Sequence, residues 1–196
     1  MIFKQSHKDL DVAEKAISNM AEAESFSDFE EEWQIFLYRI QRAWERCERK
    51  IKKEKGFQQW FKPYQKLRKN DPLLVFLKQA RDAETHAVSG TIDKPLSLQV
   101  YEKTGRSFQI EDIESTLNDG VLVVDIKSPD LFLNLDVEVK HTDPKLVKFK
   151  NRGVVYEPPK KHIGNQLEND HPVAISQLGL VFYRSFVEEA ERNFSE

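Results

Sequence analysis

Apolar residues recur at steps of three and four along four stretches of the chain, and this spacing predicts amphipathic helices. The stretches are residues 9–23, 27–55, 72–86 and a last one that begins at Pro172. The second stretch is the longest. Its continuous apolar stripe contains Phe29, Trp33, Phe36, Leu37, Ile40, Trp44, Cys47 and Ile51.

Local signals mark where these helices start and stop. Ser25 or Ser27 can cap the long second helix through its hydroxyl, and Gly56 can end it in a left-handed conformation. Asp71 followed by Pro72 is a typical helix start. The aspartate carboxylate can accept hydrogen bonds from the free backbone amides of the first turn, and proline at the first helical position has no amide hydrogen that would need an acceptor. The third helix is therefore predicted to begin at Pro72 and to end near residue 86.

Between residues 94 and 167 the pattern changes to short alternating or β-branched runs, which predict strands. Glycine and proline residues punctuate the runs, which cover residues 96–101, 121–126, 131–139 and 147–156. We predict an α+β protein, mainly a bundle of about four helices, with an antiparallel β insert between the third and fourth helices. Residues 1–93 and 168–196 would form the bundle, and residues 94–167 would form the insert.

Composition indicates the environment of the protein. The first residues lack the apolar core of a secretion signal, and no apolar run approaches the length of a membrane span. Cys47 is the only cysteine, so neither an internal disulfide nor a cysteine metal site is expected. Its place on an apolar stripe favours a core residue over a nucleophile. We expect a cytoplasmic protein without membrane association, metal or cofactor.

Charge is segregated along the chain, although the net charge is only -3. Residues 39–69 carry twelve lysines and arginines against three glutamates, a balance of +9, whereas residues 1–32 have a balance of -6. A basic block inside an acidic protein is a candidate surface for a polyanion such as RNA. The alternative is an ordinary solvated helix face. The candidate RNA-binding residues of the block are Lys52, Lys53, Lys55, Lys62 and Lys66.

The most informative motif is Arg-Asp-Ala-Glu-Thr-His at residues 81–86, where the third predicted helix ends. The planar fork of an arginine can hold phosphate oxygens, and a histidine can move protons near neutral pH. These groups suffice to cleave an RNA phosphodiester without a metal. Arg81 would bind the phosphate, His86 would transfer protons, and Asp82 would orient one of the two. Glu84 is a further acid–base candidate. In the structural alternative, Arg81 pairs with an acidic neighbour and His86 caps the helix end.

Helical geometry constrains this motif. At 100° per residue, Arg81 and His86 point about 140° apart on a straight helix, so they cannot face one phosphate from one intact helix. Either the helix ends between them, or two copies of the chain each supply one of the two residues at a two-fold axis. Arg81 and Thr85 lie only about 40° apart, so Thr85 can contact the same ligand.

The motif and its helical context resemble the HEPN superfamily of small helical-bundle proteins, whose motif is an arginine, a polar residue, three to five variable residues and a histidine. Arg81, Asp82 and His86 occupy these positions. The resemblance covers residues 9–90 and 168–196 and leaves the β insert unexplained. It implies a metal-independent endoribonuclease of a toxin–antitoxin or phage-defence system. It also implies a site formed across a homodimer and restraint by an antitoxin or regulatory protein.

Other interpretations stay open. The protein would otherwise be a non-catalytic HEPN-like module whose β insert recognises a protein or nucleic acid, or an adaptor with no nucleic-acid role. Asp125, Asp136 and Glu138 alternate on predicted strands and would suit a divalent metal, but outward-facing acids on an edge strand are commoner. The aromatic residues 57–64, predicted as a connector with a short helical turn, would stack bases or, more often, cover the helical core.

Overall fold

The computed structural model describes residues 3–85, 90–94, 96–102, 107–110, 115–118, 121–124 and 135–195. The chain divides into two compact units. The first contains Met1–Asp93 and Lys145–Glu196, and the second contains Lys94–Pro144.

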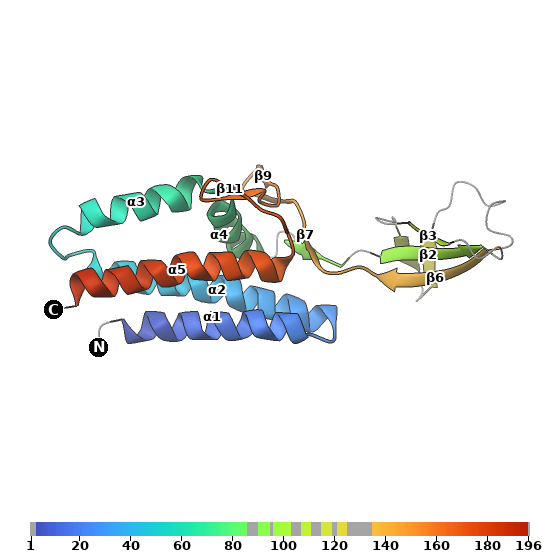
Figure 1. The fold of residues 1–196 in the computed structure, drawn as a ribbon, viewed down its shortest axis with the longest axis horizontal. Coiled ribbons are helices and arrows are strands. Elements are labelled where there is room, and N and C mark those ends of the chain that lie inside the picture. Colours follow the sequence, from blue (N-terminus) through green and yellow to red (C-terminus); the bar gives the residue numbers. More distant parts are fainter. Residues whose placement is uncertain are drawn as a thin grey trace. The chain divides into compact units, whose positions relative to one another are not determined.

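Five helices make up most of the described part of the first unit: α1 (Lys4–Glu22), α2 (Phe26–Ile51), α3 (Phe57–Asn70), α4 (Pro72–Thr85) and α5 (Pro172–Phe194). α1, α2 and α5 pack side by side, and α3 and α4 complete the bundle (Figure 1). The apolar stripe of α2 lies at the centre of the core, where Trp33, Phe36 and Trp44 are almost fully buried. Trp44 stacks on Phe186 of α5 with ring centroids 4.1 Å apart.

The expectation of four helices is wrong because the aromatic segment after residue 56 forms a complete helix rather than a short turn. α3 continues through Pro63 to Asn70. A proline removes one intrahelical hydrogen bond, but Pro63 lies on the exposed face, where the freed carbonyl can face water. The β insert therefore lies between the fourth and fifth helices, not between the third and fourth.

The aromatic side chains of α3 cover the core. Phe57 and Phe61 are buried. Trp60 stacks on Phe186 at 5.4 Å between ring centroids, and Tyr64 meets the same ring edge-on at 5.2 Å. Of the two roles considered for this segment, the cover of the helical core is the one that the contacts support.

The predicted helix starts are confirmed at two places. The Ser25 hydroxyl accepts a hydrogen bond from the Asp28 amide at 3.1 Å, at the start of α2. Oδ1 of Asp71 accepts one from the Leu74 amide at 3.1 Å, directly before Pro72 opens α4. These caps satisfy amides that have no partner inside their helices.

α4 and α5 cross closely at Gly179. A Cβ at this position would collide with Cδ1 of Leu77, so only glycine fits the crossing without a shift. The apolar stripe predicted for α5 is partly correct: Ile175 and Phe186 are buried, whereas Val181 is 64% exposed.

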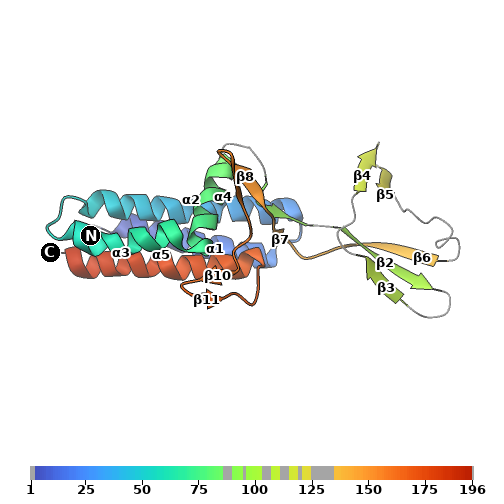
Figure 2. The same ribbon diagram turned by 90° about the horizontal axis from the view of Figure 1, so that it is seen from above.

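In the described part of the first unit, three antiparallel strand pairs accompany the helices. β1 (Ile92–Asp93) pairs with β7 (Lys145–Leu146), β8 (Phe149–Asn151) with β9 (Val154–Tyr156), and β10 (Lys161–His162) with β11 (Asn165–Gln166). β8 and β10 pack against α4 (Figure 2). Residues 145–167, which the sequence assigned to the insert, thus group with the helical unit.

Asp71 joins one of these hairpins to the bundle. Besides capping α4, its carboxylate contacts Nδ1 of His162 at 2.9 Å and accepts a hydrogen bond from the Ile163 amide at 2.6 Å. The buried carboxylate therefore fixes the β10–β11 hairpin at the first turn of α4.

The strands that the structure describes in the second unit pair antiparallel. β2 (Leu96–Glu102) lies between β3 (Ser107–Ile110) and β6 (Leu135–His141), and β4 (Ser115–Asn118) pairs with β5 (Val121–Val124). The antiparallel pairing agrees with the sequence prediction. Asp136 and Glu138 lie on β6, but their side chains are outside the described part of the structure, as is Asp125. Among the described residues, no helix has the length and apolar character needed to span a membrane.

Candidate functional site

A row of arginines runs along α2 on the side away from its apolar stripe. Arg39, Arg42, Arg46 and Arg49 follow one another at steps of three, four and three, which places them on one face of a helix. The apolar stripe fixes the rotation of α2 in the bundle. The arginine row is consequently held at the surface.

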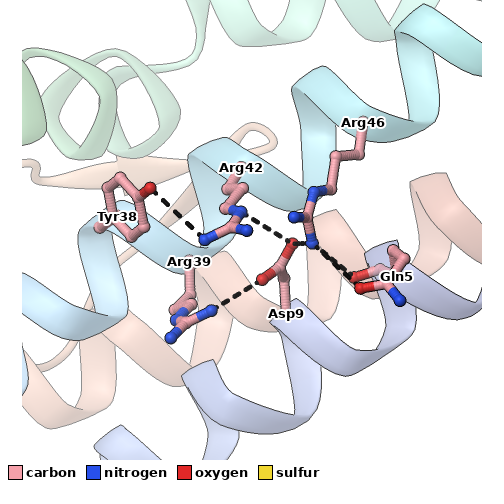
Figure 3. Close-up of polar contacts among 6 residues, drawn as sticks. All are labelled: Gln5, Asp9, Tyr38, Arg39, Arg42 and Arg46. Carbon is pink, nitrogen blue, oxygen red and sulfur yellow. Dashed lines mark hydrogen bonds and ion pairs between the residues drawn. The ribbon is translucent and has the colours of Figure 1, made fainter.

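Asp9 of α1 binds three of these arginines (Figure 3). Its carboxylate is 1% exposed and lies 3.0 Å from Nη1 of Arg39, 3.7 Å from Nε of Arg42 and 2.6 Å from Nη1 of Arg46. Arg46 also donates to the backbone oxygen of Gln5 at 3.4 Å. A buried carboxylate needs compensating charge, and here three guanidinium groups supply more than one unit. Asp9 therefore orients the row and leaves it with an excess of positive charge.

Arg81 of α4 lies close to the arginine row. Its Nη2 is 3.3 Å from Oε1 of Glu45 on α2, and its Nη1 is 3.1 Å from Oδ1 of Asp82. Its Nε is buried and has no hydrogen-bond partner in the described part of the chain. The Thr85 hydroxyl donates to the backbone oxygen of Arg81 at 2.8 Å, which closes the last turn of α4.

These residues surround an open cavity of about 410 Å³ between α2 and α4. Its lining residues are Tyr38, Gln41, Arg42, Glu45, Arg46, Arg49, Arg81 and Thr85. Four arginines and one glutamate line it, and the lining keeps an excess of positive charge even though Asp9 pairs with Arg42 and Arg46 and Asp82 pairs with Arg81. Guanidinium forks match the oxygens of phosphate and carboxylate groups, so the cavity has the chemistry of an anion-binding site. We call it the arginine cavity.

The structure brings together only part of the predicted site. Arg81 and Thr85 line the same cavity, as their helical spacing predicted, and Asp82 pairs with Arg81. His86 lies outside the described residues, so its position relative to Arg81 is not described. The structural alternative for Arg81, pairing with acidic neighbours, is present in the form of Glu45 and Asp82.

The predicted RNA-binding lysines are exposed but do not line the arginine cavity. Lys52, Lys53 and Lys55 follow the end of α2, and Lys62 and Lys66 lie on α3. The basic block therefore contributes to the cavity through its arginines. Sequence reasoning counted these arginines in the charge balance but did not single them out. Their spacing at three and four residues was the signal that would have identified the row.

Glu84 has a structural contact rather than a free carboxylate. Its Oε1 accepts hydrogen bonds from the Thr91 amide at 2.9 Å and the Thr91 hydroxyl at 2.6 Å. Trp33 in turn donates to the same hydroxyl at 2.9 Å. Glu84 thus binds Thr91, which in turn contacts the buried Trp33. This structural contact argues against the acid–base role considered for Glu84.

Cys47 is a buried core residue, as predicted. Burial, with smaller contributions from the negative charges of Glu48 and Glu191, raises the pKa of its thiol to about 12. A thiol with so high a pKa is not a nucleophile near neutral pH. Among the described residues, no three histidine, cysteine, aspartate or glutamate side chains form a group that could hold a metal ion.

Comparisons of the chain with models of known protein families, with curated proteins and with solved structures gave no match. The function of the arginine cavity is therefore inferred from its own chemistry.

Proposed function

We propose that the protein is a metal-independent endoribonuclease that binds the RNA backbone in the arginine cavity. The observation that carries this proposal is the position of Arg81. The arginine of the Arg-Asp-x-x-x-His motif lines one cavity together with Arg42, Arg46 and Arg49. Four guanidinium groups at one place favour a ligand with several adjacent negative charges, and the RNA backbone is such a ligand.

The arginines keep donors available for a phosphate. Each guanidinium carries five N–H donors, and Asp9 engages only part of those on Arg42 and Arg46. The buried Nε of Arg81 is without a protein acceptor among the described residues. Glu45 now occupies part of the Arg81 fork, and because this carboxylate is 47% exposed it can turn towards solvent when an anion enters.

The chemical step we propose uses the 2′-hydroxyl of the RNA itself. His86 takes the 2′-hydroxyl proton, the 2′-oxygen attacks phosphorus, and the bond from phosphorus to the 5′-oxygen breaks. The leaving 5′-oxygen takes a proton from a water molecule, so the products end in a 2′,3′-cyclic phosphate and a 5′-hydroxyl. Arg81 stabilises the charge that develops on the non-bridging oxygens, and Asp82 holds Arg81 in place.

We further propose that two copies of the chain act together, with contacts near residues 73–90, in a toxin or anti-phage role restrained by a partner protein. The support is the spacing of Arg81 and His86, which would point to different sides if α4, described as far as Thr85, continued straight through residue 86. The apolar side chains of α4 that the structure describes as buried already pack in their own bundle. A second copy would therefore contact the more polar side chains of α4, such as Lys78 and Asp82, rather than its apolar face.

A second candidate function has one observation in its favour. Arg81 is paired with both Glu45 and Asp82, as expected of a residue with a structural role. In that case the protein is a HEPN-like module that binds RNA or another polyanion in the arginine cavity without cleaving it.

One assay separates the two candidates. Purified protein is incubated in EDTA with single-stranded RNA, and the ends of the products are analysed. The nuclease proposal requires fragments with 2′,3′-cyclic phosphate ends. Intact RNA that nevertheless binds to the protein would leave the binding module as the function.

A further inference from the structure

Tyr38 is an exposed aromatic residue in the arginine cavity. It lies on α2, off the buried apolar stripe, and is 52% exposed. Single exposed aromatic residues are common and need no functional reason. Tyr38 differs because it lines the same cavity as Arg42 and Arg81, so its ring stands beside the groups proposed to bind phosphate.

Neighbouring arginines hold the Tyr38 side chain. Nη1 of Arg42 donates to the Tyr38 hydroxyl at 3.5 Å, and the same arginine is bound to Asp9 (Figure 3). The guanidinium carbons of Arg39 and Arg42 lie 5.9 and 5.7 Å from the centre of the ring. The ring is therefore placed by contacts that continue to the buried Asp9.

An oriented aromatic ring next to several arginines is the combination that binds single-stranded nucleic acid. The arginines follow the backbone, and the ring stacks on a base. In duplex RNA the base faces are already stacked on one another, so only an unpaired base offers a free face.

We infer that Tyr38 stacks on an unpaired base whose neighbouring phosphate is held by the arginine cavity, and that the ligand is single-stranded RNA. This inference rests on the proposed function, because it assigns the substrate class of the same site. A polyanion without bases would occupy the arginines but gain nothing from the ring.

The test compares two probes on three proteins. The probes are a single-stranded 2′-O-methyl RNA oligonucleotide, which lacks the hydroxyl needed for cleavage, and inorganic polyphosphate. The proteins are the wild type, Tyr38→Ala and Tyr38→Phe. Because Tyr38 is exposed, both variants should fold, and thermal unfolding followed by circular dichroism checks this.

Tyr38→Ala should weaken oligonucleotide binding by about 5- to 150-fold, the range for losing one base–aromatic contact, and leave polyphosphate binding unchanged. Tyr38→Phe should retain most of the oligonucleotide affinity, because it keeps the ring. If Tyr38→Ala binds the oligonucleotide like the wild type, or loses affinity equally for both probes, the stacking role is overturned while the anion site stands. If the wild type binds neither probe, the proposed function fails and the stacking role fails with it.

Discussion

The Arg81 guanidinium on α4 pairs with the Glu45 carboxylate on α2 at 3.3 Å, inside the cavity that both residues line. The carboxylate presents oxygens to the arginine as a phosphate would. Glu45 therefore competes with an incoming anion for the Arg81 guanidinium, and the anion has to displace it.

Replacing Glu45 with glutamine should strengthen anion binding. The neutral amide no longer competes for Arg81, and exposed ion pairs contribute about 0.2–1 kcal/mol, so affinity for the 2′-O-methyl RNA oligonucleotide should rise by about 1.5- to 5-fold. Fluorescence anisotropy measures the change. Glu188→Gln is the matched control, since it removes the same charge from an exposed residue of α5 outside the cavity. Weaker binding by Glu45→Gln than by this control would show that the carboxylate supports the site instead of competing within it.

Replacing Asp9 with asparagine should destabilise the protein. The change leaves Arg39, Arg42 and Arg46 without their shared carboxylate. Removing one partner of a buried ion pair costs about 3–5 kcal/mol, and partial exposure of the arginines reduces this to about 2–3 kcal/mol. Urea unfolding measures the free energy.

The control for Asp9 is Asp11→Asn on the same helix. Asp11 is exposed and lies 3.6 Å from Arg184, so its loss should change the free energy of unfolding by less than about 1 kcal/mol. If the two substitutions lower the free energy of unfolding equally, Asp9 does not stabilise the protein through the arginine row more than an exposed carboxylate would.

Replacing Gly179 with alanine should also destabilise the protein, because the new methyl group meets the buried Leu77 side chain. Forcing one extra carbon into a packed core costs about 1–3 kcal/mol. Ser185→Ala on the exposed side of the same helix is the control and should change the free energy of unfolding by less than about 0.5 kcal/mol. A Gly179→Ala protein as stable as the wild type would mean that the Leu77 side chain can repack around the new methyl group, with the higher helix propensity of alanine offsetting the cost.

Cys47 should be unreactive in the folded protein. Its thiol has a pKa raised to about 12, and it is the only cysteine, so labelling by a disulfide reagent at pH 8 reports on this residue alone. Labelling should be far slower without urea than in it. The folded state holds the thiol proton more tightly than the unfolded state. The stability gained is therefore complete below about pH 9 and is lost as the pH rises towards 12. Labelling at similar rates in both states would show that Cys47 is accessible.

Local signals in the sequence predicted a cap at Ser25 or Ser27 for α2 and at Asp71 for α4, because a cap depends on residues a few positions apart. They failed for α3, where Pro63 and the many aromatic residues suggested a connector. Its helical form depends on Trp60 and Tyr64 packing against α5, a contact between distant parts of the chain. Propensity is readily overridden by such tertiary contacts.

The candidate site was predictable to a similar extent. Arg81 and Thr85 share a cavity because they are four residues apart on one helix, which spacing alone predicts. The contribution of Arg42 and the role of Asp9 depend on how α1, α2 and α4 pack together. Sequence patterns within one helix do not contain that information.

The most direct test of the account is the rate of RNA cleavage by matched arginine and histidine variants in the presence of EDTA. Arg81→Ala should lower the rate by about 10²–10⁴-fold, because the charge developing on the phosphate is left uncompensated, and His86→Ala should lower it similarly through loss of proton transfer. Arg192→Ala, an exposed arginine of α5 that does not line the cavity, should cleave like the wild type. Wild-type protein that leaves RNA intact, or Arg81→Ala protein as active as Arg192→Ala, would contradict the account.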